Sequence, residues 1–561
     1  MKGFKNALYG QRKMKTKIGY AITMIVILCI GGMLRFYNVL DKGIFFWDEG
    51  RYYGEAQFIS LYPKMLKALS NCGSTVEKKL VITTYAKKMN ESGALTLLYA
   101  KPLHSLLTMV FINILHNKHG GCAMSAFFGL LSIALVFIFA QRLFNTHFAI
   151  VSALIMCLLP LHILYSREAM PEIDSSFFFL VSTLLLYLGI RKDKDSLWLL
   201  LFSGFFSGLA FASNYRWIVI PIIAGALLLI YQFHRKKLIH RLSLLICFLL
   251  GFSAPLITFH LHSIQWINDA RRLQLSLSQY SYLEQLKLWT VNQPGFSLIP
   301  LSKLLSLPII IFSYFGISGG ILLFVSPVFA LMKKNTQTLF FLVPLFLVML
   351  FYSLSNCIFA RMISLVLPHA AIACAYSIFS SGDVLRLLPR CDGARKTKFA
   401  KLVIGIVVGT IFLAEVTSCN VKIVQMISPF IKLSQSCEGI IQGKNVVTDS
   451  PYVVMLYIPK NKITTISSEV DETLINSDTI IASSYQGSVN RKEGMYTLRR
   501  QDTMHSKMAQ YLFKEIPFEE EDVEKEFLWH FACEHNQNIF ETIRFCKSSK
   551  RGDASIFLYS K

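Results

Sequence analysis

Residues 121–140 read GCAMSAFFGLLSIALVFIFA, a run without a single charged side chain. As an α-helix this run is about 30 Å long, which matches the hydrocarbon core of a bilayer. Comparable apolar runs recur from residue 18 to about residue 417. Beyond that point the composition becomes that of an ordinary soluble domain. We therefore divide the chain into a membrane domain, 1–417, and a soluble domain, 418–561.

The overall composition agrees with this division. The chain has 561 residues, of which 53% are hydrophobic and 16% are charged, and its mean hydropathy is +0.47. An average soluble domain carries about 25% charged residues. The net charge of +23 is explained better by Lys and Arg in cytoplasmic loops than by nucleic-acid binding. We expect contact with membrane lipids and no nucleic-acid partner.

The apolar runs predict eleven membrane-spanning helices. They lie near 18–34, 121–140, 148–165, 175–190, 197–213, 217–233, 242–259, 304–331, 338–354, 362–379 and 402–417. The first is expected to remain uncleaved, because no small-x-small cleavage pattern follows it. The run 102–115 is shorter and has charged flanks, so it predicts a helix at the membrane surface rather than a crossing.

The distribution of basic residues predicts the orientation of these helices. Cytoplasmic loops are enriched in Lys and Arg, which places the N-terminus in the cytoplasm and the loops 35–120 and about 260–303 outside, together with the tail. The main clusters that then face the cytoplasm lie at 2–17, 191–194, 235–241 and 386–401. The expected fold class is mainly α: a polytopic helical membrane protein with a small extracytoplasmic α/β domain at its C-terminus.

The tail has the pattern of a small mixed domain. Segments 445–448, 463–466 and 480–483 read as strands, and 452–457 reads as a helix between the first two. An extracytoplasmic tail would permit disulfides, although the sequence does not fix their pairing. Two pairings that the spacing allows are Cys419–Cys437 and Cys533–Cys546.

The first charged cluster follows the first apolar run and reads WDEGRYYGEA at 47–56. If this segment is helical, Asp48, Arg51, Tyr52 and Glu55 share one face. A carboxylate, a guanidinium and a phenol on one face can bind and deprotonate a hydroxyl group. The alternative is an interfacial helix that carries a solvated Asp–Arg pair.

The second cluster reads YAKPLH at 99–104. Pro102 suits the first turn of a helix, which would place Lys101 beside backbone N–H groups that favour anions. A lysine at a helix start is a reasonable site for a phosphate. The alternative is a lysine whose ammonium group extends to the lipid headgroups.

Two further charged sites fall in outer turns. The turn 166–174 reads SREAMPEID and places Arg167, Glu172 and Asp174 between two apolar runs; Arg361 precedes a proline-bearing span. The alternatives are an ordinary capped turn and an arginine anchored to lipid phosphate. The charge-based topology puts all four clusters on one side of the membrane, and this favours one shared site.

The order of these motifs resembles that of the GT-C glycosyltransferases of the protein mannosyltransferase and lipid A aminoarabinose or galacturonic-acid transferase type. The resemblance covers about residues 18–380, and Asp48-Glu49-Gly50-Arg51-Tyr52 is its most specific part. The chain has Lys101-Pro102-Leu103 where many members have Lys-Pro-Pro-Leu, and Met362 stands where a tyrosine is usual. The resemblance implies an enzyme that moves a sugar, with inversion, from a polyprenyl-phosphate donor to a lipid or cell-envelope glycan.

The resemblance also implies roles for single residues: Asp48 as catalytic base, Lys101 as the donor-phosphate contact and Glu172 as the second acid. The catalytic candidates are Asp48, Glu49 and Glu172; the donor-phosphate candidates are Lys101, Arg361 and Arg51; the substrate-binding candidates are Tyr52, Glu55, Tyr99, His104, Arg167 and Asp174. No metal ligands are assigned, a divalent metal is not indicated, and no cofactor is expected besides the donor substrate.

Three other functions remain open at this level. They are a protein O-mannosyltransferase-like enzyme, a lipid-linked glycan flippase or transporter, and a membrane anchor whose tail binds a partner. Acids are scarce inside the apolar runs, which argues against a transporter. The expected location is a bacterial inner membrane, with the endoplasmic reticulum second. The sequence identifies neither the sugar nor the oligomeric state.

Overall fold

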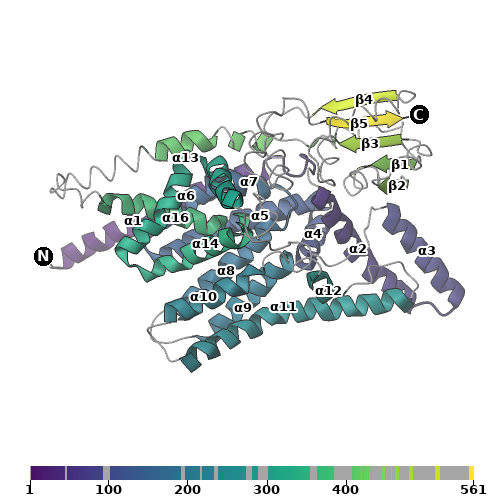
Figure 1. Cartoon of the computed structure of the whole chain (residues 1–561), viewed down its shortest axis with the longest axis horizontal. Coiled ribbons are helices and arrows are strands. Elements are labelled where there is room, and N and C mark those ends of the chain that lie inside the picture. The colour runs from purple at the N-terminus through teal and green to yellow at the C-terminus, as the bar shows by residue number, and fades with distance from the viewer. Residues whose placement is uncertain are drawn as a thin grey trace.

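The structure is a computed structural model in which most of the helical part is described. It describes residues 2–44, 47–91, 101–190, 196–214, 218–232, 238–272, 281–287, 301–353 and 363–384, short pieces between 407 and 457, and five strands that end at residue 560. The predicted mainly α, polytopic architecture is confirmed (Figure 1).

Helices of different lengths occupy the predicted apolar runs. They are α1 (Lys2–Phe36), α5 (Gly120–Leu143), α6 (Thr146–Leu158), α7 (Pro160–Tyr165), α8 (Glu172–Ile190), α9 (Leu197–Ser213), α10 (Val219–Gln232), α11 (Leu238–Arg272), α13 (Leu301–Lys333), α14 (Leu339–Ser353) and α16 (Leu367–Val384). Among the described residues, six helices are long and apolar enough to cross a membrane, and five more are apolar but shorter. The protein is therefore an integral membrane protein, while the number of eleven crossings stays a prediction.

The first loop contains three helices of its own. They are α2 (Trp47–Ser70), α3 (Thr75–Glu91) and α4 (Pro102–Leu115), and a further short helix, α12 (Tyr282–Lys287), follows α11. The helix α4 has the bounds that the sequence predicts, and it packs against α2, α5 and α9. In Figure 1, α2 and α3 lie at the end of the molecule opposite to the N-terminus.

Two predicted spans are interrupted rather than continuous. The run 148–165 is divided at Leu159, whose extended backbone allows Pro160 to begin α7. The run 304–331 is bent at Gly316, which has a positive φ of 70°. Its membrane-length part is Phe315–Lys333, so the predicted bounds of that span are wrong. The Glu415 carboxylate accepts hydrogen bonds from the Ile317 and Ser318 amides at 3.2 Å, just after the bend.

Helices α9 and α11 approach each other closely because glycines line their contact. A Cβ atom added to Gly204 would lie 1.9 Å from the Phe248 carbonyl oxygen, and one added to Gly251 would lie 2.0 Å from that of Leu201. Small residues allow membrane helices to pack backbone against backbone. This contact fixes the end of α9, where Asn214 reaches the site described below.

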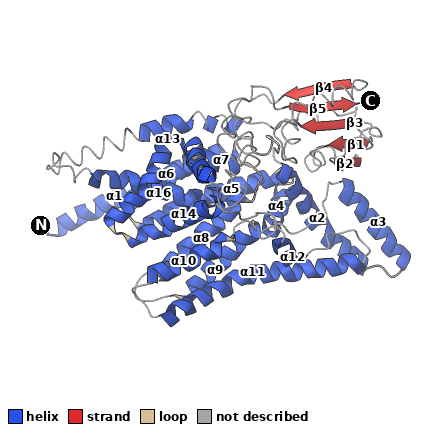
Figure 2. Ribbon diagram, in the orientation of Figure 1, coloured by secondary structure: helices blue, strands red, loops and turns tan. Residues whose placement is uncertain are grey.

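The C-terminal part contains a five-stranded mixed sheet, at the end of the molecule that also holds α2 and α3 (Figure 2). Its strands are β1 (Asn445–Thr448), β2 (Lys462–Thr465), β3 (Thr479–Ser483), β4 (Leu512–Pro517) and β5 (Ser555–Ser560), in the order β2-β1-β3-β5-β4. Strand β1 pairs in parallel with β2 and β3, and β5 pairs antiparallel with β3 and β4.

Three of these strands confirm the sequence prediction to within one residue, and β4 and β5 were not predicted. Of the helix expected at 452–457, the structure describes Tyr457, which is helical. The four cysteines of the proposed disulfides lie outside the described residues, and the boundary between residues 417 and 418 stays a prediction.

Candidate active site

The first charged cluster forms the beginning of α2. The helix starts at Trp47, and its first turn carries two carboxylates, where the helix dipole favours negative charge. Asp48 is half-buried, whereas Glu49 is fully buried. One oxygen of Glu49 accepts a hydrogen bond from the Ala169 amide at 2.8 Å. Glu49 therefore joins α2 to the outer turn before α8.

The predicted polar face of α2 is present. Arg51 Nε lies 3.2 Å from Glu55 Oε1, and the Ser105 hydroxyl donates to Glu55 Oε2 at 2.6 Å. Burial raises the pKa of the Glu55 carboxyl, while Arg51 and the Ser105 hydrogen bond act in the opposite direction. Glu55 thus connects α2 with the first turn of α4.

Lys101 joins the second cluster to the first. It immediately precedes Pro102, which is the first residue of α4, and its side chain is buried. The ammonium group donates a hydrogen bond to the Tyr52 hydroxyl and lies 4.6 Å from the centre of the same ring. Asp48 stands one helical turn before Tyr52, a separation of about 5–6 Å between Cβ atoms. The Lys101 ammonium group therefore lies at the junction of α2 and α4, against the tyrosine that follows Asp48 by one helical turn.

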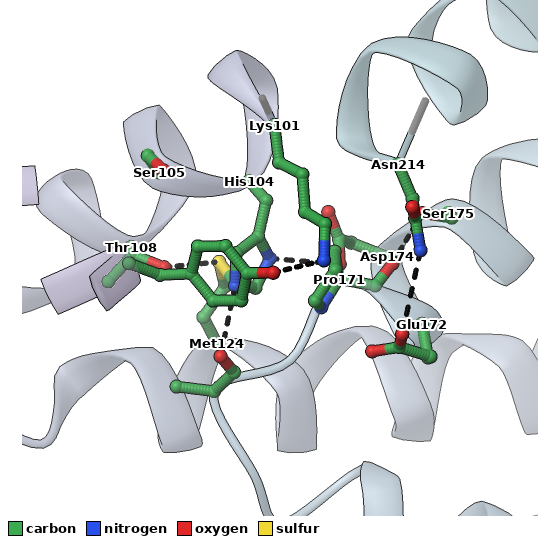
Figure 3. A network of polar contacts seen from close by, with 12 residues as sticks. Lys101, His104, Ser105, Thr108, Met124, Pro171, Glu172, Asp174, Ser175 and Asn214 are labelled. Atoms are coloured by element: carbon green, nitrogen blue, oxygen red, sulfur yellow. Dashed lines mark hydrogen bonds and ion pairs between the residues drawn. The ribbon is translucent and has the colours of Figure 1, made fainter. Parts of the chain in front are cut away.

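His104 connects this junction to the third cluster (Figure 3). Its Nδ1 lies 3.2 Å from Asp174 Oδ1, and its Nε2 lies 3.1 Å from the Ala169 carbonyl oxygen. The Tyr52 ring packs against the imidazole edge to face at 4.9 Å. Both ring nitrogens face oxygen atoms, but a neutral imidazole has one N–H. The two ring nitrogens therefore link α4 both to the Asp174 carboxylate and to the backbone of the outer turn.

The predicted acids Glu172 and Asp174 lie in the first turn of α8 and are almost fully buried. Asn214, just after α9, donates to Glu172 Oε1 at 3.5 Å. The second oxygens of Glu172 and Asp174 have no hydrogen-bond partner within the part of the chain that the structure describes. Buried carboxylate oxygens are rarely left unpaired, so these two atoms are suited to receive a donor group from a ligand.

Arg167 has a different environment from the other candidates. One terminal nitrogen faces the carbonyl oxygens of Leu34, Arg35 and Tyr37, at 3.3, 3.4 and 2.7 Å, and the other donates to the Val424 carbonyl at 2.9 Å. Burial lowers its pKa to about 10. A guanidinium group at the end of α1 complements the negative end of the helix dipole. A substrate contact from Arg167 stays a prediction.

The structure brings three of the four predicted clusters together through side-chain contacts. Tyr99 and Arg361 lie outside the described residues, so the fourth cluster has no position here. Ser105 and Asn214 belong to the network but were not predicted as site residues. Ser105 carries a signal, because it follows Lys101 by four positions. Asn214 directly follows the predicted run 197–213, but no sequence pattern assigns it a role.

The described side chains do not form a recognisable metal site. Among them there is no group of three or more His, Cys, Asp and Glu residues that would hold a metal ion. The polar groups at the junction are instead arranged in pairs, Lys101 with Tyr52, His104 with Asp174 and Arg51 with Glu55.

Comparisons with known proteins agree with the fold. The sequence model of the family described as dolichyl-phosphate-mannose-protein mannosyltransferase matches residues 100–258, a range that includes Lys101, His104, Glu172 and Asp174. No curated protein sequence matches the chain significantly.

Solved structures match over most of the chain. ArnT from Cupriavidus metallidurans bound to undecaprenyl phosphate is similar with a TM-score of 0.57 and 12% identity, over 96% of this chain and 98% of that one. The oligosaccharyltransferase AglB from Archaeoglobus fulgidus, in complex with an inhibitory peptide and a dolichol-phosphate, is similar with a TM-score of 0.54 and 12% identity, over 86% and 72%. The chain thus shares its overall fold with the ArnT and AglB structures.

Proposed function

We propose that the protein is an integral membrane glycosyltransferase that moves a sugar from a polyprenyl-phosphate donor to a lipid or cell-envelope glycan, with inversion. The observation that carries the proposal is the contact between Lys101 and Tyr52. The contact joins a buried cation to the tyrosine that follows Asp48 by one helical turn, and Lys101 and Tyr52 are 49 positions apart in the sequence. Leaving-group stabilisation and proton removal are the two functions that such a transfer requires.

In the proposed reaction Asp48 takes the proton from the acceptor hydroxyl as its oxygen attacks the anomeric carbon. The bond between that carbon and the phosphate oxygen breaks, and its electron pair leaves with the phosphate. A phosphate leaves as a stable anion and needs charge stabilisation rather than a general acid. We assign this stabilisation to Lys101, with Arg51 and Arg361 as further cations. Glu172 and Asp174 would orient the acceptor.

A lipid-linked donor is supported by the fold and by the neighbours. The similar ArnT structure contains undecaprenyl phosphate, and the similar AglB structure contains a dolichol-phosphate. A donor with a polyprenyl tail resides in the bilayer, which gives a reason for a polytopic enzyme. The proposed location is a bacterial inner membrane, with the N-terminus in the cytoplasm and the C-terminal domain outside.

The test of the base is transfer by Asp48→Asn in membranes supplied with a defined undecaprenyl-phosphate sugar and an envelope-lipid extract. General-base catalysis contributes about 10²–10⁴ in rate, so kcat should fall by that factor at unchanged expression. Asp41→Asn is the matched control, because Asp41 is an exposed acid of the same loop. Transfer by Asp48→Asn at the rate of the control would refute the assignment.

The test of the phosphate contact is Lys101→Ala, with Lys64→Ala as control. Lys64 is exposed on α2. Loss of a charge-assisted contact of about 1.5–3 kcal/mol should raise the donor KM by roughly tenfold to a hundredfold, and the control should not change it. A donor KM for Lys101→Ala equal to that of the control would remove Lys101 from the donor site.

A protein acceptor is the second candidate, and two observations favour it. The matching family is described as a protein mannosyltransferase, and the similar AglB structure contains a peptide. The same assay distinguishes the two acceptors when hydroxyl-bearing peptides replace the lipid extract. Transfer to peptide but not to lipid would establish the second candidate.

A further inference from the structure

The segment that leads into α2 is held by residues from the far end of the chain. This segment, Lys42–Ile44, lies immediately before the cluster that begins at Trp47. The Ser428 amide donates to the Lys42 carbonyl oxygen at 2.6 Å, and its hydroxyl donates to the Ile44 carbonyl oxygen. Ser428 is fully buried by these contacts. A residue that follows the last apolar run therefore bonds to both ends of the segment.

Tyr457 makes the second set of contacts. The Ile44 amide donates to its hydroxyl oxygen at 3.0 Å, and the hydroxyl lies 3.4 Å from His119 Nε2. His119 Nδ1 lies 2.5 Å from the Leu40 carbonyl oxygen. The Lys118 ammonium group lies 4.6 Å from the centre of the Tyr457 ring. Tyr457 thus joins the segment before α2 to the turn that precedes α5.

The protons in the series of hydrogen bonds from Leu40 through His119 and Tyr457 to Ile44 can be assigned consistently. The carbonyl oxygen of Leu40 accepts, so His119 Nδ1 carries the proton and Nε2 is an acceptor. The Tyr457 hydroxyl then donates to Nε2 and uses its oxygen to accept the Ile44 N–H. This assignment is consistent with a neutral imidazole ring on His119.

Gly43 shows how tightly the contact is packed. Its φ is +77°, a region that L side chains rarely adopt. A Cβ atom added there would lie 2.7 Å from the Tyr457 hydroxyl oxygen and 2.8 Å from both Ser428 Cβ and Ile431 Cδ1. Glycine is therefore required by the backbone conformation and also by the C-terminal residues that surround it.

We propose that Ser428, Ile431 and Tyr457 form a C-terminal clamp that fixes Lys42–Ile44 and thereby positions the first turn of α2. Ser428 and Tyr457 are positioning residues: they act on Asp48 through the backbone and do not touch the substrate. The effect on transfer rests on the proposed function. The clamp itself is a structural property that exchange of backbone amides measures independently.

The test uses the full-length protein in lipid nanodiscs. Amide hydrogen exchange is measured for peptides that cover residues 38–56 in the wild type, Tyr457→Phe and Gly43→Ala. Tyr37→Phe is the matched control, because the Tyr37 side chain is 59% exposed. Leaving a buried amide without its acceptor costs enough to raise its exchange by about tenfold or more. We expect this rise for Tyr457→Phe and Gly43→Ala and no change for the control.

Transfer kinetics distinguish positioning from general stability. For Tyr457→Phe, kcat should fall about tenfold, while the donor KM stays within about twofold because Lys101 is untouched, and the thermal midpoint stays near that of the control. Equal exchange in Tyr457→Phe, Gly43→Ala and the control would overturn the clamp. Faster exchange with unchanged kcat would overturn its positioning role. If the wild type itself transfers no sugar, the proposed function fails, and the exchange data still decide the clamp.

Discussion

Three acidic residues of α2 have three different environments, although they lie within eight positions of one another. Glu55 is held by Arg51 and Ser105, and Glu49 is bonded to the Ala169 amide. Asp48 is the half-buried member of the set, and it is the one we propose as the base. Under this proposal, the DEGRY motif combines a structural acid, Glu49, with a reactive one, Asp48.

Substitution of Glu49 tests this division. Glu49→Gln keeps an oxygen that can accept the Ala169 N–H, so transfer should stay within about tenfold of wild type. Glu49→Ala leaves a buried amide unpaired and should destabilise the protein by about 1–3 kcal/mol. Thermal unfolding in detergent and transfer assays measure the two effects. A loss of transfer in Glu49→Gln as large as that in Asp48→Asn would instead make Glu49 catalytic.

The His104–Asp174 pair makes a separate prediction. Residues in direct contact show coupling energies of about 0.5–3 kcal/mol in double-mutant cycles. His104→Asn and Asp174→Asn should each destabilise the protein, and the double variant should cost less than the sum of the two. Unfolding midpoints of the four proteins give the coupling. Strict additivity would show that the contact between His104 and Asp174 contributes no stability.

At the level of single elements, the glycines between α9 and α11 make the sharpest prediction. Gly204→Ala would force the new methyl group against the Phe248 carbonyl oxygen, and overpacking of this kind typically costs about 1–3 kcal/mol. Gly225→Ala is the control, because its Cβ would meet its nearest neighbour, Leu245 Cδ1, at 3.9 Å. The thermal midpoint should fall for Gly204→Ala and stay unchanged for Gly225→Ala. Equal midpoints would show that the two helices separate without cost.

The sequence predicted where helices lie better than where they are interrupted. Hydropathy located the helical runs, and Pro102 marked the start of α4. The bend at Gly316 was missed, because it depends on a carboxylate from a different helical segment. Strands β4 and β5 were missed as well, since one of them pairs with β3 across a long stretch of chain.

For the whole molecule, the prediction of a single shared site rested on the topology inferred from the distribution of basic residues. It placed the charged clusters on one side of the membrane, and the contacts of Lys101 with Tyr52 and of His104 with Asp174 join three of them. No sequence pattern indicated that Ser428 and Tyr457 reach the segment before α2. Contacts between such distant positions follow from the tertiary structure, which the local sequence does not encode.

The clamp also predicts a pH dependence of stability. Burial lowers the pKa of His119 to about 4, and the nearby charges of Lys118 and Lys42 act in the same direction, while Asp41 and the Leu40 hydrogen bond oppose them. The unfolded chain, with an ordinary pKa near 6.5, binds the proton first. Stability should therefore fall as pH decreases from about 6.5 to about 4, by roughly 3 kcal/mol in total.

The comparison of wild type with His119→Gln isolates this contribution from other titrating groups. As pH decreases over that range, the unfolding midpoint of the wild type should fall more steeply than that of His119→Gln. Above pH 7 the midpoints of the two proteins should change with pH in the same way. Parallel curves throughout would mean that His119 is not held neutral in the folded protein.

The bend in α13 has a consequence for biogenesis. When the ribosome has made the chain through Lys333, the carboxylate that accepts the Ile317 N–H does not yet exist, because Glu415 lies 98 residues after Ile317. An unpaired amide in hydrocarbon costs several kcal/mol. The nascent segment should therefore insert as one straight rod and acquire its bend when the final apolar run arrives. A chain that stops before residue 415 would keep the straight form.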